Sequence, residues 1–264
     1  NTKTIKDIFE GKHEISNQIT SAKKPLIIIG ESFFNLKSSK YLFNLIKEFL
    51  NKNDKINKDF NSLNVLSCDA STVGNYDLGL INQNKNILQD LKDNKFEILY
   101  LVGQDNLNFD KKNEFIIYQG SHGDRGAEIA DIILPGSAYT EQDGHFTNLE
   151  GKIQKALKAS YPPGDAKEDW HIINDLSEYI NNKKLFKDKD ELESSMFNYL
   201  NLQKEKQNNF IEKNSNYDLS EFFNENLDLV FKAYYFSNVI ARSSKTMIEC
   251  NNSKLNFKST GTEG

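Results

Sequence analysis

Cysteine is scarce in this chain, and its scarcity limits the metal chemistry that the chain can perform. Only Cys68 and Cys250 occur among the 264 residues. An iron–sulfur cluster or a structural zinc ion needs about four closely spaced ligands. The sequence therefore excludes a standard cysteine-ligated cluster built by this chain alone. We expect two reduced thiols, buried or inert, and a disulfide between them is the alternative.

Long apolar runs and an excess of basic charge are missing as well. The longest apolar run, residues 25–29, is far shorter than the roughly 20 residues that cross a bilayer. The 33 basic and 38 acidic residues leave a net charge of -5, which does not favour nucleic acid or an anionic membrane surface. We expect no nucleic-acid partner and no direct membrane insertion. Because Asn1 stands first, we expect a targeting segment to have been removed or to lie outside this sequence.

What the chain does contain is a series of short, continuous apolar runs. Runs of this kind, without polar alternation, are typical of strands in a parallel sheet that is covered on both faces. Helical patterns, or room for a short helix, lie between them, which indicates an α/β layer architecture. The predicted strands are residues 26–29, 98–102, 115–118 and 131–135.

Helices are predicted from apolar residues at helical spacing. One amphipathic helix follows Ser38 and Ser39, which are available as N-caps, and a polar loop is expected at 51–61. A second helix is expected around 87–95, and a short one between the glycines of 120–130. The apolar stripe of the first helix consists of Leu42, Leu45, Ile46, Phe49 and Leu50.

The composition changes near residue 181, where the chain becomes rich in Lys and Asn. We therefore expect an α/β domain at 1–180 and a mostly helical or irregular segment at 181–264. One helix is predicted there from Leu192, Met196 and Leu200. An aromatic stretch at 222–236 should be covered, either by its own domain or by another subunit.

Nearly half of the 14 glycines lie between residues 119 and 152. Glycine at this density indicates sharp turns or close approach of the backbone to a neighbour, and the polar residues between suggest a cradle for a ligand or a second chain. His122 with Asp124 and Glu128 could be metal ligands or a general base with its carboxylate, but a hydrogen-bonded loop histidine is the commoner arrangement. A second candidate acid–base cluster, with turn stabilisation or an interface as the commoner role, consists of Glu141, Asp143, His145 and Glu150.

Other candidate positions favour plain structural roles. The sequences after two strands, at 30–32 and 103–106, lack the G-x-G-x-x-G spacing of a dinucleotide site. Asp69 should oppose thiolate formation at Cys68. Trp170 is expected to fill the core.

Several of these segments resemble the molybdopterin oxidoreductase family. The resemblance rests on Ala-Asp-Ile-Ile-Leu-Pro at 130–135, Glu141, and Gly-His-Phe-Thr-Asn-Leu-Glu-Gly at 144–151. Tyr-Gln-Gly-Ser-His-Gly-Asp at 118–124 resembles the branch found in the C-terminal part of the largest iron–sulfur subunit of respiratory complex I. Segments that fit the same branch in the same order are 162–164, 168–173 and 237–247.

The resemblance implies an α/β fold with parallel-sheet layers of the molybdopterin oxidoreductase type and a mostly helical or irregular C-terminal extension. It also implies a structural part of the NADH-oxidising peripheral arm of NADH:ubiquinone oxidoreductase, with no cofactor in this chain and no catalysis by it alone. The iron–sulfur clusters and FMN are expected in neighbours, namely the cluster-bearing N-terminal half of the same subunit and the flavin subunit. The expected location is the matrix side of the mitochondrial inner membrane, or the cytoplasmic face of a bacterial membrane.

The resemblance further implies a vestigial pocket, with no catalytic residue and no metal ligand. A fragment of a molybdopterin-dependent oxidoreductase such as formate dehydrogenase is the alternative, with the pterin against residues 103–106 and 120–126. A free-standing flavodoxin-like module fits least, because the chain has no phosphate loop. The candidate pocket residues are Gly103, Asn106, Gly120, His122, Gly123 and Gly126.

Overall fold

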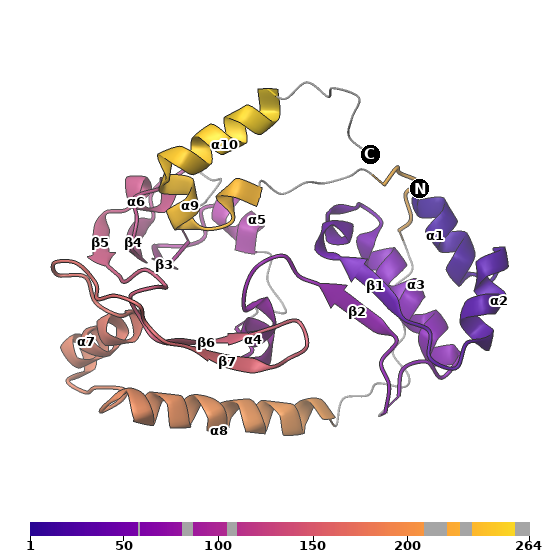
Figure 1. Cartoon of the computed structure of the whole chain (residues 1–264), viewed down its shortest axis with the longest axis horizontal. Helices are drawn as coiled ribbons and strands as arrows, with labels where there is room; N and C mark the ends of the chain where they lie inside the picture. Colours follow the sequence, from indigo (N-terminus) through magenta and orange to yellow (C-terminus); the bar gives the residue numbers. More distant parts are fainter. Residues whose placement is uncertain (58, 81–86, 105–109, 209–220, 228–233, 257–264) are drawn as a thin grey trace. The chain divides into compact units, whose positions relative to one another are not determined.

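The structure, a computed structural model, contains two compact units (Figure 1). It describes residues 1–57, 59–80, 87–104, 110–208, 221–227 and 234–256. Unit 1 comprises residues 1–78, 147–152 and 199–230, and unit 2 comprises 79–146, 153–198 and 231–264. Each unit is therefore assembled from segments far apart in the sequence. The predicted boundary after residue 180 stays a prediction.

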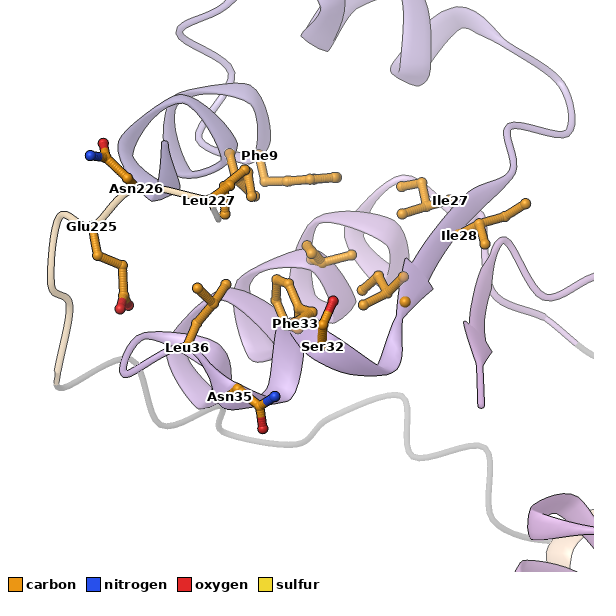
Figure 2. A pocket seen from close by; sticks show the side chains of 14 residues that line it. Phe9, Ile27, Ile28, Ser32, Phe33, Asn35, Leu36, Glu225, Asn226 and Leu227 are labelled. Atoms are coloured by element: carbon orange, nitrogen blue, oxygen red, sulfur yellow. The ribbon is translucent and has the colours of Figure 1, made fainter. Parts of the chain in front are cut away.

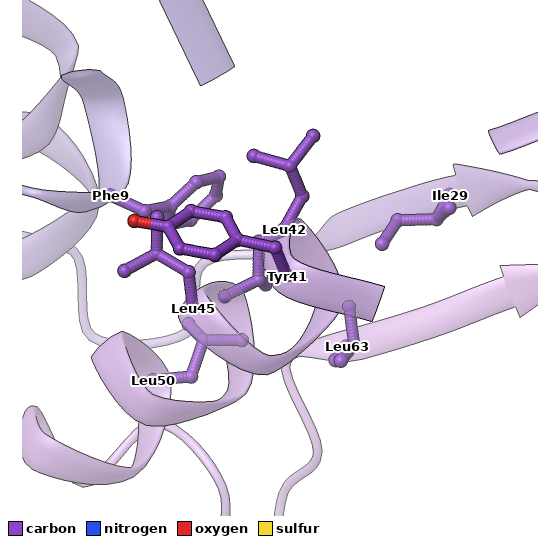
Figure 3. Packing of buried hydrophobic residues seen from close by; sticks show 8 residues of the cluster. Phe9, Ile29, Tyr41, Leu42, Leu45, Leu50 and Leu63 are labelled. Atoms are coloured by element: carbon purple, nitrogen blue, oxygen red, sulfur yellow. The ribbon is translucent and has the colours of Figure 1, made fainter. Parts of the chain in front are cut away.

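Unit 1 is built around a short parallel sheet and one long helix. Strand β1 (Ile27–Gly30) pairs in parallel with β2 (Leu63–Leu66), and helix α3 (Ser39–Lys52) connects them. Leu42 and Leu50 of α3 are fully buried, and they form a core with Phe9 (Figure 3). The predicted strand and amphipathic helix are confirmed. The remaining elements are α1 (Thr2–Phe9), α2 (Glu14–Ser21), η1 (Glu31–Asn35) and α4 (Thr72–Asp77).

Residues 221–227 fold back onto unit 1 as an extended strap. The Thr2 backbone N–H donates to the Glu225 carbonyl at 3.0 Å, and the Glu225 N–H donates to the Thr2 hydroxyl at 2.9 Å. Ser38 is the N-cap residue of α3 but makes no side-chain cap; its buried hydroxyl donates to the Phe223 carbonyl at 2.6 Å. Ser38 was predicted as a helix cap, and the structure instead uses it to hold the strap.

Unit 2 contains a three-stranded parallel sheet in the order β3, β4, β5. The strands are β3 (Ile98–Val102), β4 (Phe115–Gly120) and β5 (Ile132–Pro135), which confirms three predicted strands. Helices α5 (Ile87–Lys92) and α6 (Arg125–Ile129) lie where helices were expected. Ile116 and Tyr118 are buried on one face of the sheet. On the other face Ile98 is 63% exposed, so the described residues do not provide the expected cover of both faces.

The later elements are two strands and several helices. A second two-stranded sheet pairs β6 (Gly144–Thr147) with β7 (Ile153–Ala156), and neither strand was predicted. Helices α7 (Asp169–Asn181) and α8 (Lys189–Asn208) follow, and α8 buries Leu200 as its apolar spacing predicted. The C-terminal helices are η2 (Tyr234–Phe236), α9 (Val239–Ser243) and α10 (Lys245–Asn256).

Parallel sheets with connecting helices, followed by a helical C-terminal segment, confirm the predicted α/β class. No helix within the described ranges is long and apolar enough to cross a bilayer. Sequence reasoning missed α1, α2, α4, α7, β2 and the β6 and β7 pair. Except for α7, these are short elements whose apolar residues are interrupted by Asn, Lys or Gly, so their periodicity is weak.

Candidate functional site at the strand ends

Three glycines lie where the parallel strands of unit 2 end. Gly103 follows β3, Gly120 ends β4, and Gly136 follows β5. The Gly103 N–H donates to the Gln119 carbonyl at 2.8 Å, and the Gly136 N–H donates to the Gly120 carbonyl at 3.0 Å. The carboxyl ends of parallel strands are where open α/β sheets bind ligands. The sheet therefore brings two of the predicted pocket residues, Gly103 and Gly120, to this edge.

The side chain of Tyr118 takes up the space beside Gly120 and Gly126. Tyr118 is 2% exposed, and its hydroxyl donates to the His122 carbonyl at 3.1 Å. A Cβ atom on Gly126 would lie 2.5 Å from the Gln104 carbonyl oxygen and 2.9 Å from the Tyr118 ring. A Cβ atom on Gly120 would collide with the Tyr118 hydroxyl. Both glycines therefore make room for the chain's own atoms.

At Gly120 and Gly126 this arrangement leaves no space for a molybdopterin. A pterin cradle needs glycines that face open space bounded by donors, whereas Gly120 and Gly126 face Tyr118 and backbone. Gly103 has a φ of +62°, a left-handed conformation that favours glycine. The turn alone therefore explains this glycine, and no ligand is needed to account for it. A Cβ atom on Gly123 would meet nothing within 4 Å in the described part of the chain, and Asn106 lies outside the described residues. That these positions form a vestigial pocket stays a prediction.

A buried polar network that sequence reasoning missed lies at the same edge. Gln119 is fully buried, and its amide donates to Asp169 Oδ1 at 2.7 Å while its oxygen accepts from the Tyr100 hydroxyl. Gln142 donates to Asp169 Oδ2 at 2.9 Å and accepts from the Asp169 N–H at 3.1 Å. Burial, and then the charge of Asp169, raise the pKa of Tyr100. The network joins the motifs at 118–124 and 168–173, although Gln119 and Asp169 are 50 positions apart.

A second cluster is centred on Glu168, the N-cap residue of α7. Lys158 and Lys189 donate to its two carboxylate oxygens at 3.2 and 2.9 Å, and the Trp170 ring N–H donates at 3.1 Å. Burial alone would raise the pKa of Glu168, but the hydrogen bonds from Lys189, Lys158 and Trp170 outweigh it and lower the pKa. Lys189 also lies 3.5 Å from Asp143. Trp170 is thus half-buried and anchored by a hydrogen bond, rather than filling the core as predicted.

His122, Asp124 and Glu128 do not form one site. The His122 ring is bonded to the Ser121 hydroxyl at 2.9 Å, whereas a bond to turn backbone was the expected arrangement. Asp124 caps α6 through the Arg125 N–H at 2.9 Å, and Glu128 lies 3.4 Å from the Arg125 guanidinium. Each of the three polar groups is committed to a separate structural contact.

The second predicted cluster is dispersed in the same way. Glu141 accepts from the Ala138 N–H at 3.0 Å, and Asp143 accepts from the Lys158 N–H at 2.7 Å. The His145 ring packs edge-on against Phe197, with centroids 5.4 Å apart. Glu150 lies in the turn after β6. Across the described ranges, no group of three or more His, Cys, Asp and Glu side chains is placed to hold a metal ion.

A cavity of about 530 Å³ lies in unit 1 beside β1 (Figure 2). Its walls are mostly apolar and include Ile27, Phe33 and Leu36, and Glu225 of the strap lies at its margin. Gly30 and Ser32 also line it, so the sequence at 30–32 borders an apolar cavity. Such a lining does not suit a phosphate group, in agreement with the missing dinucleotide motif.

The two cysteines are not joined in a disulfide. Cys68 is exposed and its backbone N–H donates to the Glu31 carboxylate at 3.1 Å, whereas Cys250 is half-buried. Cys68 is therefore not buried, and the expectation that it is inert stays a prediction. Its position in the turn after β2 leaves its side chain in solvent.

Comparison with known proteins gives the class that this fold defines. The family model for molybdopterin oxidoreductase matches residues 1–179, so the chain belongs to the molybdopterin oxidoreductase family. Within it, the chain is similar to subunits of respiratory NADH dehydrogenases. It is 36% identical over 94% of its length to the NADH-ubiquinone oxidoreductase 75 kDa subunit of Reclinomonas americana, of which it covers 37%.

Two further relatives agree with this placement. The mitochondrial 78 kDa subunit of NADH-ubiquinone oxidoreductase from Candida albicans is 36% identical over 94% of this chain, which covers 35% of that protein. A subunit of the NADH-quinone oxidoreductase from Rickettsia bellii is 35% identical over 98% of this chain, which covers 37% of that protein. The chain spans little more than a third of the length of these relatives.

Proposed function

We propose that the chain is a structural part of the NADH-oxidising peripheral arm of respiratory complex I. The observation that carries this proposal is the similarity to complex I subunits along 94% of the chain, through both compact units. If the glycine-rich loop alone mattered for function, sequence similarity to the relatives would be expected in that loop and not along the whole chain. Similarity along nearly the whole chain supports a role for the entire architectural block.

The proposed role is support without electron transfer through these residues. Two cysteines cannot ligate a standard iron–sulfur cluster. The strand ends are taken up by Tyr118 and by the network of Gln119 with Asp169, which are contacts internal to the chain. In this proposal, the iron–sulfur clusters and FMN belong to neighbouring polypeptides.

The proposed partners are other peripheral-arm subunits, above all the cluster-bearing half of the same subunit and the flavin subunit. The proposed location is the matrix side of the mitochondrial inner membrane, with the cytoplasmic face of a bacterial membrane as the alternative. Both relatives from mitochondria and relatives from Rickettsia species support this pair of locations.

A tagged copy of the chain, expressed in its own cells, tests the proposal. We expect it to migrate on native gels with the band that oxidises NADH, and a tagged Ile116→Asp variant to be absent from that band. Ile116 is fully buried, so a carboxylate there should unfold unit 2. Lys12→Ala, at an exposed site, is the matched control and should incorporate normally.

The same tagged material distinguishes the alternative, a fragment of a molybdopterin-dependent oxidoreductase. That alternative draws support from the family match. It predicts molybdenum bound in stoichiometric amount and a fluorescent oxidised pterin after acid extraction. Either finding in the purified chain, or failure of the intact chain to join an NADH-oxidising complex, would refute the structural role.

A further inference from the structure

The sequence motif at 237–247 has no role in the function proposed above, yet it contacts the glycine-rich loop. The Arg242 Nε atom donates to Asp124 Oδ2 at 3.0 Å, and Nη1 donates to the Phe236 carbonyl at 3.4 Å. One guanidinium therefore holds both the loop before α6 and the backbone before α9. In Figure 1, α9 and α6 are drawn in the same region of unit 2.

Both ends of this contact are fixed by local structure. Asp124 is the N-cap of α6, and its Oδ1 accepts from the Arg125 N–H at 2.9 Å while Oδ2 faces Arg242. On the other side, Asn238 caps α9 by accepting from the Ala241 N–H at 2.9 Å. The backbone on both sides of the contact is therefore ordered by its own cap, which lowers the entropy cost of this charge-assisted contact.

The Arg242 side chain is less exposed than that of Arg125, the arginine of the glycine-rich loop itself. The Arg242 and Asp124 side chains are 20% and 34% exposed. Arg125 is 41% exposed and pairs at 3.5 Å with Asp110, which is fully exposed. Surface pairs of that kind contribute little, whereas a partly desolvated pair with a second hydrogen bond contributes more.

We infer that Arg242 is a positioning residue that latches the C-terminal segment, residues 234–256, onto the glycine-rich loop, residues 120–126. The loop then depends for its conformation on a segment more than a hundred positions away in the sequence. Both carboxylate oxygens of Asp124 are used, so the loop is committed to an internal contact. This inference concerns unit 2 alone and stands whether or not the chain assembles into complex I.

Hydrogen exchange of the full-length chain, followed by mass spectrometry, tests the latch. In Arg242→Ala we expect amides of both 119–127 and 236–248 to exchange roughly three- to tenfold faster, because the contact that protects both is lost. Arg242→Lys should give an intermediate change, since one ammonium cannot keep both acceptors in the geometry of a guanidinium. Peptides from 39–52 of unit 1 serve as the internal reference and should not change.

Two variants separate the latch from general loosening of the loop. Asp124→Asn removes the charge but keeps an acceptor for the Arg125 N–H, so α6 stays capped. Combined with Arg242→Ala, it should add little to either single change, as expected for two partners in one contact. Arg125→Ala is the matched control and should leave peptide 236–248 unchanged.

Three results would overturn the latch. One is an unchanged 119–127 peptide in Arg242→Ala, and another is additive effects of Asp124→Asn and Arg242→Ala. The third is faster exchange of 236–248 in Arg125→Ala equal to that in Arg242→Ala. If Arg242→Ala also speeds exchange in the reference peptide, the milder Arg242→Lys variant is compared with the wild-type chain instead. A wild-type exchange pattern in Arg242→Lys would refute the role of the guanidinium group.

Discussion

The strap at 221–227 makes a quantitative prediction for Ser38→Ala. The Ser38 hydroxyl is fully buried, donates to the Phe223 carbonyl at 2.6 Å and accepts from the Phe223 N–H at 2.8 Å. The carbonyl keeps a second donor, the Thr2 hydroxyl at 2.9 Å, whereas the acceptor of the N–H is the Ser38 hydroxyl itself. The variant therefore loses two hydrogen bonds and leaves one donor without its acceptor.

The magnitude follows from these two losses. A lost hydrogen bond costs about 0.5 to 1.5 kcal/mol, and the Phe223 N–H is only partly buried, so it can be hydrated when its acceptor is removed. We expect Ser38→Ala to lower the free energy of unfolding of unit 1 by roughly 1 to 3 kcal/mol. Ser39→Ala removes a neighbouring, half-buried hydroxyl of the same helix and should cost less than about 0.5 kcal/mol.

Urea denaturation followed by circular dichroism measures the loss, and hydrogen exchange places it. The exchange rate of the Phe223 amide should rise strongly in Ser38→Ala, because the strap opens before the core does. Equal midpoints for Ser38→Ala and Ser39→Ala, with unchanged exchange at Phe223, would refute the assignment of Ser38 to the strap.

Three further changes probe unit 2, each read by urea denaturation with the single tryptophan as fluorescent probe. Gln119→Leu should destabilise by roughly 2 to 4 kcal/mol, because it breaks the bonds to Tyr100 and Asp169, and a wild-type midpoint would contradict the network. Gly126→Ala should cost roughly 1 to 3 kcal/mol, because its Cβ atom would approach a backbone oxygen to 2.5 Å; an unchanged midpoint would mean that the loop yields freely. Burial alone would raise the pKa of Glu168, but hydrogen bonds from two lysines and Trp170 outweigh it and lower the pKa. The stabilisation that Glu168 contributes is therefore complete above the ordinary glutamate pKa of 4.5 and is lost as pH falls through the lower pKa of the folded state. Glu168→Gln should remove this part of the slope of unfolding free energy against pH, and an unaltered slope would assign it to other groups.

The apolar patterns predicted those elements whose burial is local. The continuous runs at 98–102 and 115–118 became β3 and β4, and the spacing of Leu42, Leu45 and Leu50 became the buried face of α3. The short pairs β1 with β2 and β6 with β7 were only partly foreseen, because their polar residues hide the period. Strand pairing, not composition, stabilises them.

The candidate site was predicted less well than the fold. Gly103 and Gly120 were expected near one another, and the parallel sheet does place them at one edge. The acid and histidine residues at 122–128 and 141–150 were predicted to be mainly structural, and this stays a prediction. His122, Asp124, Glu141 and Asp143 each have a separate hydrogen-bond partner. The motifs at 118–124 and 168–173 include Gln119 and Asp169, but no sequence signal showed that these two side chains meet in a buried network. A polar residue in a strand, such as Gln119, reads as exposed until its partner is known.

The sequence by itself determined the α/β class, the family, and the absence of enough cysteine for a cluster, because each depends on local pattern or on composition. Only the tertiary structure decided which polar groups meet: Ser38 with Phe223, Gln119 with Asp169, and Asp124 with Arg242. Their separations in the sequence are large, and a hydrogen bond depends on distances of a few tenths of an ångström. Such contacts exist only after the chain has folded and brought distant segments together.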